Sequence, residues 1–144
     1  MSQHVFTYGS LMFAPVWQRV VAARHRSCAA NLTGYRRFAL ADETYPGMIE
    51  AAGGSVTGVL YFDVNDADLR ALDVFEGREY ARRTVQVTTP AQEQVMAQTY
   101  VFLVPALLAA HDWEPAAFPI DRFMRTYCSG RLSDAVPAGE NEPV

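Results

Sequence analysis

Glu76 is the side chain in this sequence that packing explains least well. It follows Leu69 and Leu72 in a segment with helical spacing, seven residues after Leu69, where another core side chain is expected. A carboxyl group partly withdrawn from water has a raised pKa, and the negative end of a helix dipole acts in the same direction. A glutamate there would be a general base suited to nearly neutral pH. The alternative is that the helix ends at Gly77 and Glu76 turns to solvent or to a nearby arginine: Arg78, Arg82 or Arg83.

The tetrapeptide Tyr8–Leu11 is the second feature that could do chemistry. The apolar run HVFTYGSLM is interrupted there by a glycine and a serine. A strand that stops at such a pair turns backbone N–H groups out of the ladder, and a row of unpaired donors can hold an anion or an oxyanion. A plain turn explains the same residues, because glycine adopts dihedrals that other residues resist. Ser10 has no GxSxG elbow around it, so we expect it to act as a donor and not as a nucleophile.

The sequence gives less evidence for a functional role of the other polar and aromatic residues. Tyr80 and Tyr100 lie on the two expected strands after Glu76 and suit either the core or the rim of a site. Arg82 and Arg83 alternate on one strand, so at most one of them faces a site. The histidines have no metal-ligand spacing, and we expect no metal site.

Together, these motifs resemble the gamma-glutamylcyclotransferase superfamily, and in particular its AIG2-like branch. The resemblance rests on VFTYGSLM (5–12), YPG (45–47), VTGVLYFDV (56–64), ALDVFEGREYARRTV (71–85) and MAQTYVFLV (96–104). It implies a small barrel-like α+β fold with a cavity at one mouth. It also implies that Glu76 is the general base and that Tyr8, Gly9, Ser10 and Leu11 bind the gamma-glutamyl group. Tyr80 matches the tyrosine that follows the glutamate in the motif, and with Tyr100 it completes the expected substrate-binding set. The rest of the pocket is expected to come from the loop over 41–47, the hairpin around Pro90 and the segment near Trp113.

The implied reaction makes physical sense of both features. The α-amine of a gamma-glutamyl compound attacks its own γ-carbonyl, closes a five-membered lactam, 5-oxoproline, and releases the attached amine. Because the nucleophile belongs to the substrate, the enzyme has to fold the substrate, accept a proton and stabilise an oxyanion. We therefore expect an acyltransferase or lyase of the gamma-glutamylcyclotransferase type that needs no cofactor.

Two other functions fit the same residues. One is a non-catalytic module of the same fold that binds a small anion, with Glu76 as an acid in the cavity wall. The other is a gamma-glutamyl hydrolase in which Glu76 activates water. The expected partner is a small gamma-glutamyl compound, and the leaving amine stays open.

The elements that must position these residues alternate short strands with few helices. We expect a strand before Tyr8, a short helix in 14–25, strands in 28–41, 47–52 and 56–64, and a helix from an Asn65 cap to Gly77. A hairpin over 80–89 and 94–104 and an amphipathic helix over 113–130 follow. The pattern is not β-α-β-α, so it predicts an α+β class with a mostly antiparallel, curled sheet and short flanking helices. We assign residues 1–132 to one domain and 133–144 to a flexible tail.

Composition bounds the class of protein. A chain of 144 residues with a formal net charge of −4 fits one globular domain without the basic surface of a nucleic-acid-binding protein. Cys28 and Cys128 are a hundred residues apart and are expected to be small buried thiols. We find no secretory leader and no apolar stretch long enough to span a membrane, which predicts a cytoplasmic protein, either a monomer or a weak homodimer.

Overall fold

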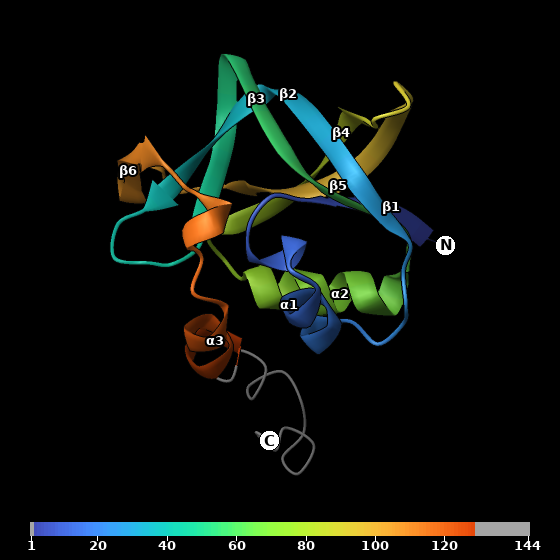
Figure 1. Cartoon of the computed structure of the whole chain (residues 1–144), viewed down its shortest axis with the longest axis horizontal. Helices are drawn as coiled ribbons and strands as arrows, with labels where there is room; N and C mark the ends of the chain where they lie inside the picture. The colour runs from blue at the N-terminus through green and yellow to red at the C-terminus, as the bar shows by residue number, and fades with distance from the viewer. Residues whose placement is uncertain (1, 129–144) are drawn as a thin grey trace.

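The computed structural model describes residues 2–128, and a six-stranded, mostly antiparallel sheet is its central feature (Figure 1). The strands are β1 (Ser2–Thr7), β2 (Ser27–Leu40), β3 (Pro46–Asn65), β4 (Tyr80–Thr88), β5 (Gln94–Phe102) and β6 (Leu108–Asp112). With only short helices beside this sheet, the predicted α+β class is confirmed. The expected domain boundary and the tail over 133–144 lie outside the described residues.

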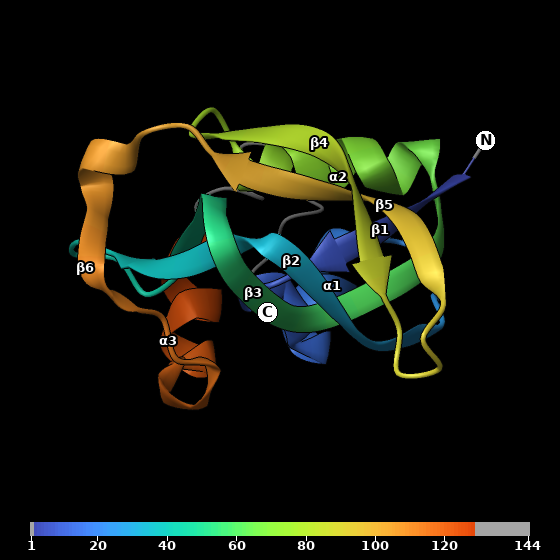
Figure 2. The ribbon, with the colours of Figure 1, turned by 90° about the horizontal axis from the view of Figure 1, so that it is seen from above.

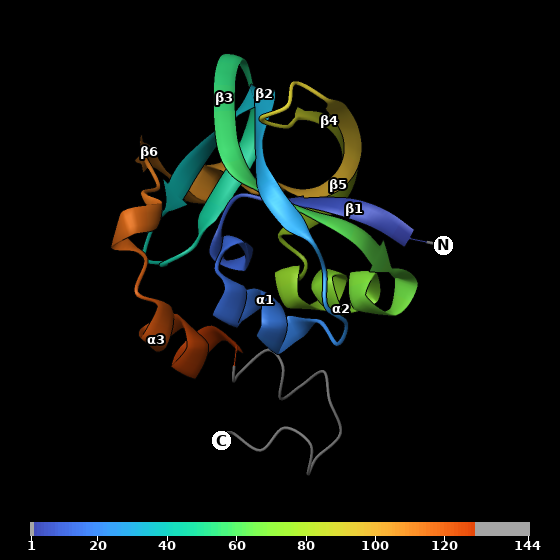
Figure 3. The same ribbon diagram turned by 45° about the vertical axis from the view of Figure 1, so that its right-hand side comes forward.

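The sheet curls until its edges meet. The strand order is β3-β1-β5-β4-β2-β6, and β3 also pairs with β2, so five strands form a closed ring with β6 attached to β2. Among the strand pairs within residues 2–128, only β1–β5 is parallel. Figures 2 and 3 show the curvature, with the β4–β5 hairpin bending round to face β2 and β3. The closure brings β1 next to β5, so Tyr8, which directly follows β1, lies beside Tyr100 of β5.

β3 is one strand where we expected two. The predicted break at Gly53-Gly54 is a bend within the strand: Thr33 pairs with Ser55 and Tyr35 pairs with Glu50, so β3 carries extra residues there. Gly53 has a φ of +79°, and a Cβ on Gly54 would lie 2.4 Å from the carbonyl oxygen of Tyr35. Both glycines are therefore needed for the bend, and the ladder with β2 continues on either side of it.

The helices α1 (Ala14–Val20) and α2 (Asp66–Glu76) cover one face of the sheet. α3 (Ile120–Phe123) lies beside α1, on the side away from α2 (Figures 1 and 3). α2 has the predicted caps. The Asn65 side chain accepts a hydrogen bond from the Asp68 N–H at 2.8 Å, and Gly77 takes a φ of +82° after the last turn. Pro15 stands in the first turn of α1, as expected.

Two helix predictions were too long. α1 ends at Val20 because the Asp68 carboxylate accepts hydrogen bonds from the N–H groups of Ala22 and Ala23, at 2.9 and 3.1 Å, and holds this segment out of the helix. The expected helix over 113–130 begins only at Ile120. Pro119 disfavours helical backbone in the residue before it, and β6, which sequence analysis missed, precedes Trp113.

The apolar side chains form two clusters, one inside the ring and one between the sheet and the helices. Phe6 and Tyr8 face the inside with Met48, Leu60 and Val87. Val5 faces the helices, where it joins a cluster that includes Trp17, Leu72, Phe75 and Phe123. Alternate residues of β1 thus serve different cores, as the two-residue period of a strand requires. Cys28 is only partly buried, and none of the helices described between residues 2 and 128 is long and apolar enough to cross a membrane.

Candidate active site

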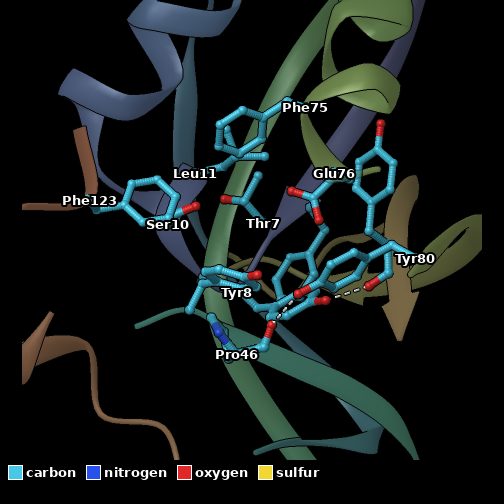
Figure 4. A pocket seen from close by; sticks show the side chains of 13 residues that line it. Thr7, Tyr8, Ser10, Leu11, Pro46, Phe75, Glu76, Tyr80 and Phe123 are labelled. Carbon is cyan, nitrogen blue, oxygen red and sulfur yellow. Dashed lines mark hydrogen bonds between the residues drawn. The ribbon is translucent and has the colours of Figure 1, made fainter. Parts of the chain in front are cut away.

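A pocket opens where the end of β1 meets the end of α2 (Figure 4). It is narrow, with a cavity volume of about 30 Å³. Its walls come from six segments of the chain: Phe6–Leu11, Tyr45–Pro46, Phe75–Glu76, Tyr80, Tyr100 and Phe123. Every residue that we selected as a catalytic or substrate-binding candidate lines this pocket, although about 65 residues separate Leu11 from Glu76.

Glu76 is the last residue of α2 and is partly buried in this pocket. The buried face of the helix continues through Leu69 and Leu72 to Phe75, which is 1% exposed, so Glu76 lies at the edge of the apolar stripe and not in its centre. Figure 4 shows its carboxylate turned into the space lined by Thr7 and Tyr80. Arg82, one of the arginines considered as its partner, forms an ion pair with Asp73.

The charge of Glu76 acts on two tyrosines of the pocket. Burial raises the pKa of Tyr8 well above its usual range, and the Glu76 carboxylate raises it further. The pKa of Tyr100 is raised as well. Burial is the largest cause, the hydrogen bond to Asp73 is the next, and the charge of Glu76 contributes less. Both phenols therefore stay protonated at neutral pH and can line the pocket as neutral groups.

The carbonyl oxygens of the loop that follows β1 all accept hydrogen bonds. The four carbonyl oxygens from Tyr8 to Leu11 accept in turn from Arg37 Nη1 (2.7 Å), Met12 N–H (3.0 Å), Phe13 N–H (3.1 Å) and Tyr61 Oη (3.0 Å). The ladder of β1 ends at Thr7, and the first bond of the short helix η1 (Ser10–Met12) is made by the Met12 N–H. The N–H groups of Gly9, Ser10 and Leu11 therefore lie outside the β1 ladder and outside the turn bonds of η1.

Gly9 is held against Pro46. A Cβ on Gly9 would lie 2.9 Å from both Cδ and Cγ of Pro46. The Tyr80 hydroxyl in turn donates to the Pro46 carbonyl at 2.7 Å. Tyr80 therefore fixes Pro46, the residue that lies against Gly9. Only glycine at position 9 leaves room for the loop beside this proline.

Tyr100 connects the pocket to a polar network on its outer side. Its hydroxyl donates to Asp73 Oδ1 at 2.7 Å, and the same oxygen accepts from Arg82 Nε at 2.9 Å. The backbone carbonyl of Tyr100 accepts from the Tyr8 hydroxyl at 2.6 Å. Asp73 stands one turn before Glu76, so this network fixes the last turn of α2 against β4 and β5. Arg82 belongs to this outer network, and neither Arg82 nor Arg83 lines the pocket.

The residues selected from the sequence line one pocket, but the other expected walls are only partly found there. We expected contributions from the segment before Gly47, from the hairpin around Pro90 and from the region of Trp113. Tyr45 and Pro46 do line the pocket, whereas Pro90 and Trp113 line separate depressions. Thr7, Asp73 and Arg37 were not selected. Asp73 lies inside the LDVFEG motif, but nothing local predicts its contact with Tyr100.

Comparison with known proteins agrees with this architecture. A family model described as "Gamma-glutamyl cyclotransferase, AIG2-like" matches residues 5–115. The chain belongs to this family. AIG2-like protein D of Arabidopsis thaliana is 35% identical over 115 residues, which cover 76% of each chain. Several other AIG2 relatives from this plant are longer, and the chain spans 58–62% of their length.

The fold of this family member also occurs among solved structures. A solution structure of the Arabidopsis thaliana protein At3g28950.1 superimposes with a TM-score of 0.70 at 29% identity, covering 100% of this chain and 92% of the other. A structure titled "Gamma-glutamyl cyclotransferase" superimposes with a TM-score of 0.63 at 19% identity, covering 99% and 85%. The second likeness shows a shared fold, and the roles of the individual pocket residues stay predictions.

Proposed function

We propose that this member of the AIG2-like family is a gamma-glutamylcyclotransferase that acts on a small gamma-glutamyl amine or amino acid. The products are 5-oxoproline and the free amine. One observation carries the proposal: Glu76 and the loop Gly9–Leu11, whose N–H groups lie outside the β1 ladder and the turn bonds of η1, line the same pocket.

Glu76 is the general base in this proposal. It accepts a proton from the substrate α-ammonium, and the α-nitrogen then forms a bond to the γ-carbonyl carbon. The bond between that carbon and the leaving nitrogen breaks as Glu76 gives this proton to the departing nitrogen. The ring nitrogen still carries a second extra proton, which Glu76 also passes to the departing amine, so the products are a neutral lactam and an ammonium ion. One side chain thus serves both steps, so the atoms and protons balance without another reactant.

The loop Gly9–Leu11 supplies the electrostatic part of the mechanism. Attack on the γ-carbonyl places negative charge on its oxygen, and preorganised N–H donors stabilise such a charge more than the neutral carbonyl that precedes it. The same row of donors suits the substrate α-carboxylate. The apolar walls, among them Phe6, Phe75 and Phe123, surround the carbon chain of the folded substrate.

Product analysis tests the proposal. Purified protein is incubated with a panel of gamma-glutamyl amines and gamma-glutamyl dipeptides, and 5-oxoproline and glutamate are both quantified. Release of 5-oxoproline with an equal amount of amine supports cyclisation. Free glutamate would instead identify a hydrolase, and saturable binding without any turnover would identify a binding module.

A further inference from the structure

Arg37 is an unusual side chain for its place in β2. The guanidinium is partly buried, and Nη1 donates to the Tyr8 carbonyl oxygen at 2.7 Å and to the Thr57 carbonyl oxygen at 3.3 Å. Its Cζ lies 5.4 Å from the centre of the Trp113 ring. Burial lowers the pKa of Arg37, an effect opposed by the charges of Glu114 and Asp112. A charged group is therefore withdrawn from water to contact main-chain carbonyls.

The neighbouring Arg36 shows the ordinary alternative. It is exposed, pairs with Asp112 at 2.9 Å, and lies over the Phe38 ring. Both arginines line the same groove, but they contact different groups. Only Arg37 reaches the loop that lines the candidate active site.

The contact with Tyr8 fixes a whole peptide unit. The carbonyl of Tyr8 and the N–H of Gly9 belong to the same planar peptide, and no peptide bond among residues 2–128 is cis. In a trans peptide these two groups point in opposite directions. Because the carbonyl points to Arg37 on β2, the Gly9 N–H points away from β2. A cation on the carbonyl oxygen also polarises the peptide and strengthens its N–H as a donor.

We propose that Arg37 is a positioning residue that orients and polarises the Tyr8–Gly9 peptide, so that the Gly9 N–H becomes a donor to the substrate oxyanion. The role in turnover rests on the proposed function, whereas the orientation of the peptide does not. Arg37 lines a groove beside Trp113 and Glu114 and not the catalytic pocket, so it acts through the loop and does not touch the substrate.

The test compares Arg37→Met, Arg37→Lys and Arg36→Met with the parent protein. The amide resonance of Gly9 is followed by NMR in ¹⁵N-labelled protein, and its movement on addition of 5-oxoproline is recorded. The kcat and KM for the best gamma-glutamyl substrate and the melting temperature are measured on the same preparations. Arg36→Met is the matched control, because it removes a guanidinium from the same strand without touching Tyr8.

We expect Arg37→Met to move the Gly9 resonance upfield, to reduce its response to 5-oxoproline, and to lower kcat by about tenfold or more while KM changes less than threefold. Arg37→Lys should recover part of each effect, since an ammonium can still donate to the Tyr8 carbonyl. If Arg37→Met does not fold, Arg37→Lys is expected to show a smaller change in the same direction.

A Gly9 resonance that responds no more to the Arg37 substitutions than to Arg36→Met would overturn the proposal. Equal kcat in Arg37→Met and Arg36→Met would overturn it as well. A parent protein that releases no 5-oxoproline from any substrate would refute the proposed function alone, because the Gly9 resonance still reports how Arg37 acts on the peptide.

Discussion

Replacing Gly9 with alanine should displace the loop that holds the N–H donors. The new Cβ would lie 2.9 Å from two ring carbons of Pro46, where carbon atoms normally approach to about 3.5–4.0 Å, so the loop or the proline must move by roughly 0.6 to 1 Å. Pro46 resists because its ring is rigid, its carbonyl is held by Tyr80, and its backbone pairs with Ala39 of β2. We therefore expect the loop to move.

The size of this displacement sets the expected loss. Overpacking of this kind costs about 1–3 kcal/mol, or roughly 3 to 10 °C in melting temperature for a chain of this length. A reacting group misplaced by about 1 Å can cost about a hundredfold in rate. Gly9→Ala should therefore remain folded at 25 °C and lose on the order of a hundredfold in 5-oxoproline release.

The matched control is Gly53→Ala. Gly53 has a φ of +79° and no atom within 4 Å of a Cβ built there, so alanine would strain the backbone far from the pocket without a clash. Its stability should fall by about 1 kcal/mol while turnover stays within a fewfold of the parent. Near-normal turnover in Gly9→Ala would show that the geometry of Gly9–Leu11 does not matter for the reaction, and the mechanism proposed for the loop would be wrong.

Three further predictions concern the framework of the site. Burial raises the pKa of Tyr61 from 10.0 to about 12, so the parent protein should lose stability as the pH rises from 10 to 12. In urea denaturation, Tyr61→Phe should lose less stability over this range, and equal losses would refute the assignment. Tyr100→Phe removes the hydrogen bond to Asp73 and should lower the free energy of unfolding by about 1–2 kcal/mol. The kcat should change less than tenfold, and a much larger fall would show that the hydroxyl takes part in catalysis. Asp68→Ala leaves two backbone N–H groups without their acceptor and should cost about 2–4 kcal/mol in denaturant titrations, and a loss below 1 kcal/mol would contradict this role.

The features predicted well from sequence are those specified by neighbouring residues. Helix α2 carries its own start and stop signals in Asn65 and Gly77, and the β4–β5 hairpin shows its alternation within about 25 residues. Glu76 and Tyr8–Leu11 could be selected because each disturbs a local pattern, and the family resemblance linked the two. The local sequence predicted the length of the helices less well. α1 is shorter than predicted because the Asp68 carboxylate, 45 residues from Ala23, binds the segment that follows it.

The features that sequence analysis missed depend on contacts between distant segments. β6 has only five residues, and it is a strand because its backbone pairs with β2. The continuity of β3 through Gly53-Gly54 depends on β2 in the same way. Asp73 meets Tyr100 across 27 residues, and Arg37 meets Tyr8 across 29. No spacing rule predicts such pairs, because the closed sheet creates them.

The most direct measurement of the central claim is 5-oxoproline release by Glu76→Gln, with Glu79→Gln as the control. Glutamine keeps the size of the side chain but cannot accept the α-ammonium proton, so Glu76→Gln should bind 5-oxoproline as the parent does and lose on the order of a hundredfold or more in kcat. Glu79 lies outside the pocket, and its substitution should leave kcat within a fewfold of the parent. A folded Glu76→Gln protein that releases 5-oxoproline at nearly the parent rate would contradict the assignment of Glu76 as the base.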